Sequence, residues 1–293
     1  MKKILVTGAY GYIGSHTVKA LAEQGHAVYA LDIEKSNNDI SKYLQSEKAF
    51  IHKDVTKTNH GRKWFDVIVH LAGLLDIEAS VDEPWVYTQT NVTGTYNTII
   101  NYPAENFIFA STAAAFNPVS PYAQTKILAE TIIRRYCLNH TIFRFFNVAG
   151  NNGEFGQIGR PTHLVRIAAE AAAGKRGFVT INGTDWDTYD GTCVRDYIHV
   201  SDLVDGIIKA VNEPSNKPFE CIGTGRNFSV KQVVTTMQEV TGVKFPVNYG
   251  PRRAGDTATV VVPPGLLSNY VSCSRSLEDM CLSAYQSELR RVG

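Results

Sequence analysis

The sequence predicts an α/β fold, a doubly wound parallel sheet accompanied by a smaller lobe of mixed α and β structure. In the first half of the 293-residue chain, short runs rich in Val, Ile and Phe alternate with longer amphipathic stretches. This alternation is typical of parallel strands joined by crossover helices that cover both faces of a sheet. Later segments contain Gly and Pro residues that interrupt the alternation. This interruption favours a second lobe.

The expected elements follow in chain order. Strands are expected at residues 3–7, 27–31, 50–52, 67–71, 107–110 and 141–145. A helix from about residue 12 to Gln24 follows the first strand, and a helix-like segment at 203–211 precedes a strand near 219–222, which can extend the same sheet after an excursion. Ser276 to Asp279 matches a capping box, so a last helix is expected there.

These elements predict two interleaved domains. The sheet domain is expected to cover residues 1–148, with a return segment at about 194–228. The smaller, substrate-binding lobe is expected to cover 149–193 and 229–293. Its irregular stretches suit a lobe that closes over a cleft.

Composition and charge exclude several classes of protein. The apolar share of 44% with 19% charged residues is ordinary for a globular chain, and no run approaches the roughly 18 apolar residues of a membrane span. A formal net charge of +1 without a dense Lys/Arg stripe gives no electrostatic basis for a nucleic-acid or membrane partner. The five scattered cysteines form no metal or disulfide pattern, and no cleavage site follows the N-terminus, so we expect reduced thiols, no metal and a cytoplasmic location.

A glycine-rich turn follows the first strand. Gly8 permits a tight turn, Gly11 lets the backbone approach a pyrophosphate, and Gly14 lets the next helix pack closely, with helix N–H groups facing the phosphates. Asp32 stands eighteen residues after Gly14, where a carboxylate can bind both adenosine ribose hydroxyls and repel a 2′-phosphate. The first half therefore reads as a Rossmann-type domain that prefers NAD to NADP.

A candidate catalytic group lies farther along. Tyr122 and Lys126 are four residues apart, so on a helix they share one face. A phenol with a reference pKa of about 10 needs help to act as a base, and we expect Lys126 and an oxidised nicotinamide to favour the phenolate. Thr112 ends a strand at the sheet edge where ligands bind, and it can relay a proton to Tyr122. The ordinary alternatives are an exposed helix pair and a hydroxyl that satisfies a strand end.

Together these motifs resemble the extended short-chain dehydrogenase/reductase family, and more narrowly the UDP-glucose (UDP-galactose) 4-epimerases. The match covers most of the chain. Besides the glycine turn it includes VHLAG at 69–73, NVTGT at 91–95, RFFN at 144–147, DGTCVRDYIHVSDL at 190–203 and PRRAGD at 251–256. The block at 191–203 is the most specific for a sugar-nucleotide enzyme.

The resemblance implies a role for each matched residue. The cofactor NAD would contact Gly8, Gly11, Tyr12, Ile13, Gly14, Asp32, Asp54, Val55, Leu71, Ala72, Gly73, Asn91, Tyr122, Lys126 and Phe146. Of these, Asp54 and Val55 would lie by the adenine. The UDP-sugar would contact Thr112, Asn147, Leu164, Arg195, Arg253 and Asp256. Guanidinium groups suit a pyrophosphate and a carboxylate suits ribose hydroxyls. The ordinary alternative pairs Arg195 with Asp196 or Asp202, and Arg253 with Asp256.

The resemblance further implies 4-epimerisation of a UDP-hexose. Tyr122, with Thr112, would remove the C4 hydroxyl proton as hydride passes to NAD, and the transient 4-keto sugar would turn before the hydride returns. Dehydratases and decarboxylases of the superfamily place an acid after the Ser/Thr, where this chain has Ala113 and Ala114. Another nucleotide-sugar epimerase, a reductase, decarboxylase or dehydratase, and a non-catalytic NAD-binding protein remain open. A homodimer is expected.

The chain departs from the family pattern at several positions. The loop at 116–121 is short. Residues that differ from the usual type are Phe116 for a tyrosine, Leu75 for a lysine, Asn182 for an aromatic residue and His163 for an asparagine. Val260 occupies a position that is bulkier in some relatives, and we hypothesise that a small residue there admits 2-acetamido sugars.

Overall fold

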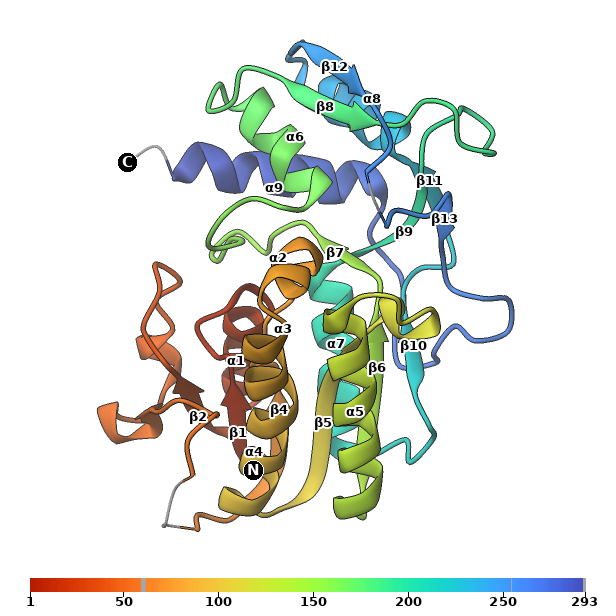
Figure 1. Ribbon diagram of the computed structural model, residues 1–293. Coiled ribbons are helices and arrows are strands. Elements are labelled where there is room, and N and C mark those ends of the chain that lie inside the picture. The colour runs from red at the N-terminus through yellow and green to blue at the C-terminus, as the bar shows by residue number, and fades with distance from the viewer. Residues whose placement is uncertain (59–61, 254, 292–293) are drawn as a thin grey trace. The chain divides into compact units, whose positions relative to one another are not determined.

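The chain folds into two compact units that interleave in sequence. The structure is a computed structural model that describes residues 1–58, 62–253 and 255–291 (Figure 1). Unit 1 comprises Met1–Phe145 and Val204–Glu220, and unit 2 comprises Phe146–Leu203 and Cys221–Gly293. The segment that returns to unit 1 is shorter than the expected 194–228, because residues 194–196 pair with 227–229 in a sheet of unit 2.

A seven-stranded sheet organises unit 1. Its strand order is β10-β6-β5-β4-β1-β2-β3, and β1 pairs in parallel with both β2 and β4. The bounds are β1 (Lys3–Thr7), β2 (Ala27–Asp32), β3 (Phe50–His52), β4 (Phe65–His70), β5 (Ala104–Thr112), β6 (His140–Phe145) and β10 (Glu220–Ile222). Every expected strand is present, and the predicted α/β fold with a doubly wound parallel sheet is confirmed. The main differences are that β4 and β5 start earlier than expected and that β5 extends to Thr112.

Helices connect these strands. They are α1 (Tyr12–Glu23), α2 (Ile77–Asp82), α3 (Pro84–Tyr87), α4 (Gly94–Asn101), α5 (Pro121–Tyr136) and α7 (Val200–Asn212), with a π-helical segment at Thr88–Thr93 and 3-10 turns at Ser41–Tyr43, Glu47–Ala49 and Ala113–Phe116. Figure 1 shows α4 and α5 side by side in front of the sheet. Helix α5 begins where its sequence favours a start, because the Ser120 side chain accepts a hydrogen bond from Ala123 N and Pro121 occupies the first turn.

The sheet of unit 1 is covered on both faces. Phe107 and Phe109 of β5 pack in a buried cluster with Ala129 and Ile133 of α5. Ile108, which lies between the two phenylalanines, is also almost completely buried. Since successive side chains of a strand point to opposite faces, both faces carry apolar cover.

A buried ion pair ties α5 to the sheet. Glu130 accepts hydrogen bonds from Arg144 Nε and Nη2, each at 2.9 Å, and from the Ser111 hydroxyl at 2.6 Å. The Arg144 guanidinium lies 3.9 Å from the centroid of the Phe219 ring and 4.9 Å from that of Phe116. The Glu130 side chain is only 1% exposed and that of Arg144 10%, so both charges depend on these partners.

Unit 2 is smaller and mixes helices with short sheets. Helices α6, α8 and α9 pack on one another around Val165, Val233, Met237, Met280 and Cys281. Its elements are β7 (Asn147–Ala149), α6 (Leu164–Ala172), β8 (Val179–Asn182), β9 (Val194–His199), β11 (Asn227–Ser229), α8 (Val230–Thr241), β12 (Val247–Gly250), β13 (Thr259–Val260) and α9 (Leu277–Arg290). The capping box expected at Ser276 and Asp279 is confirmed at the start of α9.

The cysteines of the described chain are free thiols. Burial raises the pKa of Cys137 and of Cys281 to about 12, so both stay protonated and unreactive. Within the described residues, no helix combines the length and the apolar character that crossing a membrane requires.

We predict that Glu130→Gln lowers the free energy of unfolding by about 3–5 kcal/mol, because it leaves the buried Arg144 guanidinium without its carboxylate. Denaturant unfolding followed by circular dichroism measures this change. Arg134→Gln is the matched control. Arg134 lies 3.3 Å from the same carboxylate, but its side chain is 35% exposed, so the expected change is at most about 1 kcal/mol. Equal effects of the two substitutions would contradict the assignment.

Candidate active site

The glycine turn of unit 1 has the close-packed form that its sequence predicts. Gly8 has φ +65°, and a Cβ there would lie 2.8 Å from Ala72 N. A Cβ on Gly14 would lie 2.0 Å from Gly8 O, so neither position admits a side chain. Gly11 N donates to Gly8 O at 3.0 Å. The turn therefore lies directly against the loop that follows β4.

Helix α1 begins at this turn and can receive an anion. Tyr12 and Ile13 open it, no described side chain caps it at Gly11, and its first turn holds no acidic residue. The first N–H groups of a helix lack partners within the helix and attract negative charge. This end of α1 is therefore suited to a phosphate.

Asp32 is held at the end of β2. Its Oδ2 accepts from Tyr10 N at 2.9 Å and its Oδ1 from Ile33 N at 2.8 Å. Burial raises the pKa of Asp32, while these backbone hydrogen bonds lower it. Each carboxylate oxygen still has a lone pair beyond those the N–H groups use, so the group can accept hydrogen bonds from ribose hydroxyls.

The loop after β4 meets Asn91 and Lys126. The Asn91 side chain accepts from Leu74 N at 2.9 Å and donates to Leu74 O at 3.0 Å. A Cβ on Gly73 would lie 2.9 Å from Asn91 Oδ1 and 3.2 Å from Lys126 Nζ. The structure thus brings together three predicted cofactor residues from three separate segments.

Tyr122, Thr112 and Lys126 lie together in unit 1. The Thr112 side chain hydrogen-bonds Tyr122, and its Oγ1 also accepts from Ala114 N at 3.2 Å. Lys126 Nζ donates to Ala110 O at 2.9 Å and lies 4.9 Å from the centroid of the Phe109 ring. Tyr122 is 8% exposed and Lys126 is 6% exposed, so the exposed helix pair considered above is wrong.

Burial dominates the electrostatics of this group. It raises the pKa of Tyr122, and the Thr112 hydrogen bond opposes the rise. It also lowers the pKa of Lys126 to about 8, against the attraction of Glu130. The expected help of Lys126 together with an oxidised nicotinamide stays a prediction, because without the cofactor the cost of burying a phenolate outweighs the effects that lower the Tyr122 pKa.

Two residues that lie near Tyr122 and Lys126 were not predicted from the sequence. Tyr87 of α3 is 3% exposed, and its ring centroid lies 6.5 Å from that of Tyr122 at an interplanar angle of 80°. Glu130 follows Lys126 by four residues, so its place on the face of α5 that carries Tyr122 and Lys126 could have been found from helical spacing. Tyr87 had no comparable signal, because only the packing of α3 on α5 brings it there.

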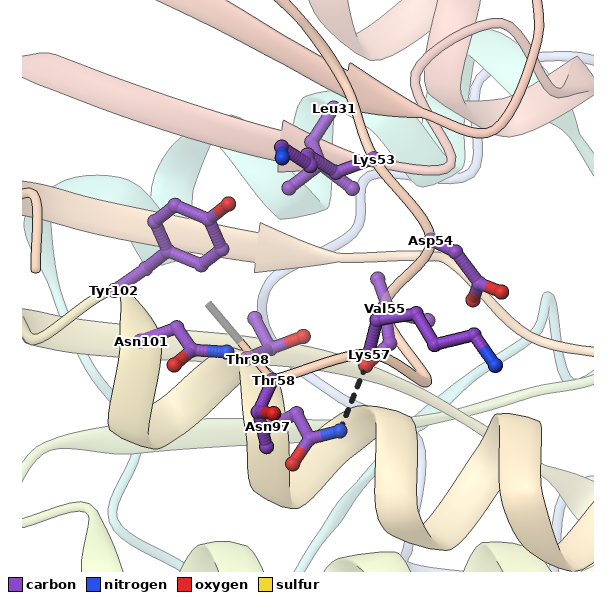
Figure 2. A pocket seen from close by; sticks show the side chains of 10 residues that line it. All are labelled: Leu31, Lys53, Asp54, Val55, Lys57, Thr58, Asn97, Thr98, Asn101 and Tyr102. Carbon is purple, nitrogen blue, oxygen red and sulfur yellow. Dashed lines mark hydrogen bonds between the residues drawn. The ribbon is translucent and has the colours of Figure 1, made fainter. Parts of the chain in front are cut away.

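Asp54 and Val55 line a groove in unit 1 between the 53–58 segment and α4. Asn97 Nδ2 donates to Val55 O at 3.1 Å and to Thr56 O at 3.0 Å. Figure 2 shows Asn97 and Thr98 on α4 facing this segment. The lining residues are Leu31, Lys53, Asp54, Val55, Lys57, Thr58, Asn97, Thr98, Asn101 and Tyr102.

Phe146, Asn147 and Leu164 belong to unit 2. Phe146 is buried, and its backbone N donates to Ile222 O at 3.1 Å. Asn147 Nδ2 donates to Asp196 O at 3.0 Å, which anchors β7 beside β9. Leu164 is the first residue of α6 and packs against the core of unit 2.

Arg195, Arg253 and Asp256 also belong to unit 2. Arg195 Nη2 lies 3.5 Å from Asp256 Oδ1, and Arg195 Nη1 donates to Thr257 O at 2.9 Å. With its amide oxygen turned toward Arg253, Asn182 accepts from Arg253 Nη2 at 3.2 Å and Nε at 3.0 Å. Arg195 therefore pairs with Asp256 rather than with Asp196 or Asp202, and Arg253 contacts Asn182. Ala254 of the matched motif lies outside the described residues.

The comparisons agree with this layout. A family model described as "NAD dependent epimerase/dehydratase family" matches residues 4–222. The UDP-glucose 4-epimerase of Halalkalibacterium halodurans is 34% identical over 290 residues, covering 88% of this chain and 86% of that protein.

Two solved structures also match. The UDP-glucose 4-epimerase from Stenotrophomonas maltophila, with bound NAD and formylated UDP-arabinopyranose, has a TM-score of 0.88 at 26% identity and covers 100% of both chains. The UDP-Glc/GlcNAc 4-epimerase from Campylobacter jejuni has a TM-score of 0.80 at 32% identity, covering 98% of this chain and 100% of that one. Since the family model spans most of the sequence and the relatives match along nearly its whole length, the chain belongs to the NAD dependent epimerase/dehydratase family.

Proposed function

We propose that the protein is an NAD-dependent UDP-hexose 4-epimerase that interconverts UDP-galactose and UDP-glucose. The observation that carries the proposal is the buried pair Tyr122 and Lys126 with the half-buried Thr112, next to the loop that closes on the glycine turn. Relatives bearing the name UDP-glucose 4-epimerase, with about a third of their residues identical, support the same reaction.

The residues of unit 1 fit NAD. The glycine turn leaves no room for a side chain between the phosphate-binding end of α1 and the β4 loop. The Asp32 carboxylate is half-buried and is oriented by backbone N–H groups, among them those of Tyr10 and Ile33. When bound, NAD would supply the acceptor and then the donor of the hydride that is exchanged at C4 of the sugar. We propose that the set of cofactor residues given above holds it, with Asp54 and Val55 next to the adenine.

Residues of the chain itself transfer the proton of the C4 hydroxyl and provide the positive charge that this transfer needs. We propose that Tyr122 takes the proton of the C4 hydroxyl through or beside Thr112 and later gives it back. Because burial raises the Tyr122 pKa, the resting phenol is protonated, and positive charge is needed when it acts as a base. Lys126, with a pKa of about 8, remains an ammonium at neutral pH and can bind the nicotinamide ribose hydroxyls.

Unit 2 supplies the side chains that suit the UDP moiety. We propose that Arg195 and Arg253 bind the pyrophosphate and that Asp256 binds ribose hydroxyls, with Asn147 and Leu164 beside them. The Arg195 to Asp256 pair is long, at 3.5 Å, so both groups retain hydrogen-bonding capacity for a ligand. Holding the nucleotide firmly and the hexose loosely allows the 4-keto sugar to present its other face.

Elimination is less well supported than epimerisation. The 3-10 turn that follows Thr112 consists of Ala113–Phe116 and carries no carboxylate that could remove a second proton. A reductase would need a steady supply of reduced cofactor, whereas an epimerase regenerates NAD in every cycle. A non-catalytic NAD-binding protein would have no need of the buried Tyr122 to Thr112 contact.

We also propose a homodimer that works in the cytoplasm. Val81 of α2, Trp85 of α3 and Leu128 of α5 are 62%, 68% and 51% exposed. Helices α2 and α3 both pack on α5, so these apolar side chains lie on one group of helices, as a subunit contact requires. The free cysteines suit a reducing compartment.

The direct test is to incubate the purified protein with UDP-galactose, without added NAD, and to quantify UDP-glucose by anion-exchange chromatography. We expect conversion to an equilibrium mixture, because the cofactor is regenerated in each cycle. Parallel incubations with other UDP and TDP sugars separate related activities. A 4-keto-6-deoxy product would indicate a dehydratase, released CO₂ a decarboxylase and net NADH consumption a reductase. Any of these results would contradict the epimerase assignment.

We predict that Tyr122→Phe lowers kcat at least about 100-fold, because it removes the general acid and base, while NAD binding persists. Steady-state kinetics and a fluorescence titration of NAD measure the two effects. Tyr136→Phe removes a hydroxyl from the same helix at a residue that is 57% exposed, and this control should retain full activity. A Tyr122→Phe protein with more than a tenth of the wild-type kcat rules out the proposed role.

We predict turnover of UDP-GlcNAc as well as UDP-glucose, because Val260 offers a small side chain. Val260 pairs with Arg195 in the register of β13 and β9, so it lies beside a residue proposed to bind UDP. Val260→Tyr should lower kcat/KM for UDP-GlcNAc by about tenfold or more relative to that for UDP-glucose. Absence of UDP-GlcNAc turnover in the wild-type protein refutes the hypothesis.

A further inference from the structure

A buried histidine that the proposed mechanism does not use lies beneath the cofactor loops of unit 1. His70 is the last residue of β4 and has no exposed surface. Its ring stacks on Phe109, with centroids 5.9 Å apart and an interplanar angle of 18°, and is tilted against Phe107. Both ring nitrogens are hydrogen-bonded, Nδ1 to Thr7 Oγ1 at 2.7 Å and Nε2 to Thr95 Oγ1 at 3.1 Å.

The surrounding hydrogen bonds define which nitrogen carries the proton. Thr95 Oγ1 donates its only proton to Asn91 O at 2.7 Å, so it must accept from Nε2. Thr7 Oγ1 accepts from Ala72 N at 3.2 Å, and its own proton is available for Nδ1. The network is therefore satisfied by the Nε2–H tautomer, with one donor and one acceptor on the ring.

This histidine joins two segments that the cofactor needs. On the Nδ1 side, Thr7 immediately precedes Gly8 of the glycine turn, and its hydroxyl holds the backbone N–H of Ala72. On the Nε2 side, the Thr95 hydroxyl donates a hydrogen bond to the backbone carbonyl of Asn91. All these groups are buried or nearly so, and an unpaired polar group there is costly.

The same network continues to the catalytic helix. Asn91 Nδ2 donates to Thr125 Oγ1 at 3.1 Å, and Thr125 Oγ1 donates to Tyr122 O at 2.7 Å. A continuous run of hydrogen bonds thus connects the start of the glycine turn with the backbone of Tyr122. His70 is the link between Thr7 and Thr95 in this run.

We propose that His70 is a positioning residue that sets the distance between the glycine turn and the 71–73 loop, and so the affinity for the dinucleotide. The proposal rests on the NAD site of the proposed function. Burial, with a smaller effect of the Lys126 charge, lowers the pKa of His70 to about 3. The ring therefore keeps one donor and one acceptor at every pH at which the protein works.

The test compares two substitutions of His70. Gln supplies one acceptor and one donor, whereas Phe fills the space without either. We expect His70→Phe to weaken NAD binding about tenfold or more, since it leaves two buried hydroxyl partners unsatisfied, and His70→Gln to stay within about threefold of wild type. Affinity is measured by fluorescence titration, and thermal unfolding identifies any variant that fails to fold.

His140→Phe is the matched control, because His140 is also a buried histidine of the same sheet and should leave the affinity for NAD unchanged. A purely structural role would lower the stability of both phenylalanine variants without a selective loss of NAD binding. Wild-type affinity in His70→Phe, or equal losses in the Phe and Gln variants, overturns the proposal.

A spectroscopic measurement tests the proposal even if a variant does not fold. Long-range ¹H–¹⁵N spectra of the wild-type protein should show His70 as the Nε2–H tautomer, without titration between pH 5 and pH 9. A Nδ1–H tautomer, or a midpoint near the ordinary histidine value, contradicts the network. None of these readouts needs turnover. If the wild-type protein shows no epimerase activity but His70→Phe selectively weakens NAD binding, the proposed function is rejected and the positioning role of His70 is retained.

Discussion

The structure of unit 1 depends on the burial of one polar face of helix α5. Tyr122, Lys126 and Glu130 recur at intervals of four residues on that face, and all three are less than a tenth exposed. A phenol, an ammonium and a carboxylate can be buried together only where each finds a partner. Thr112 and the Ala110 carbonyl of β5 serve the first two, and Arg144 of β6 serves the third. The end of the sheet is thereby aligned with helix α5.

The second constraint is the close approach of the glycine turn to the β4 loop. A Cβ on Gly8 would collide with the backbone of Ala72, so the two segments can meet only because one of them lacks a side chain. The polar network through His70 then joins the same two segments. Packing brings the backbones of the glycine turn and the β4 loop into contact, and the hydrogen bonds define the distance between these two segments. The glycine turn and the backbone of Tyr122 are therefore joined physically through His70, Thr95, Asn91 and Thr125.

In unit 2, charged residues that look equivalent in sequence have different partners. Asp196 accepts hydrogen bonds from Thr224 and from Gly225 N, and Asp202 from Ser274, so both are structural. Arg195 and Asp256 face each other across a long contact and keep capacity for a ligand. Asp196 and Asp202 therefore stabilise the fold of unit 2, whereas Arg195 and Asp256 have the chemistry that suits a nucleotide.

The sequence by itself determined the strand positions, the glycine turn, the acid at the end of β2 and the four-residue spacing of Tyr122 and Lys126, because these depend on local periodicity and on backbone geometry at single residues. Family resemblance named the residues of unit 2. Only the tertiary structure decided the direction of the Tyr122 pKa shift, the partner of Arg195, the packing of Tyr87 and the network of His70. Each of these depends on burial and on contacts between segments far apart in the chain, which no local pattern encodes.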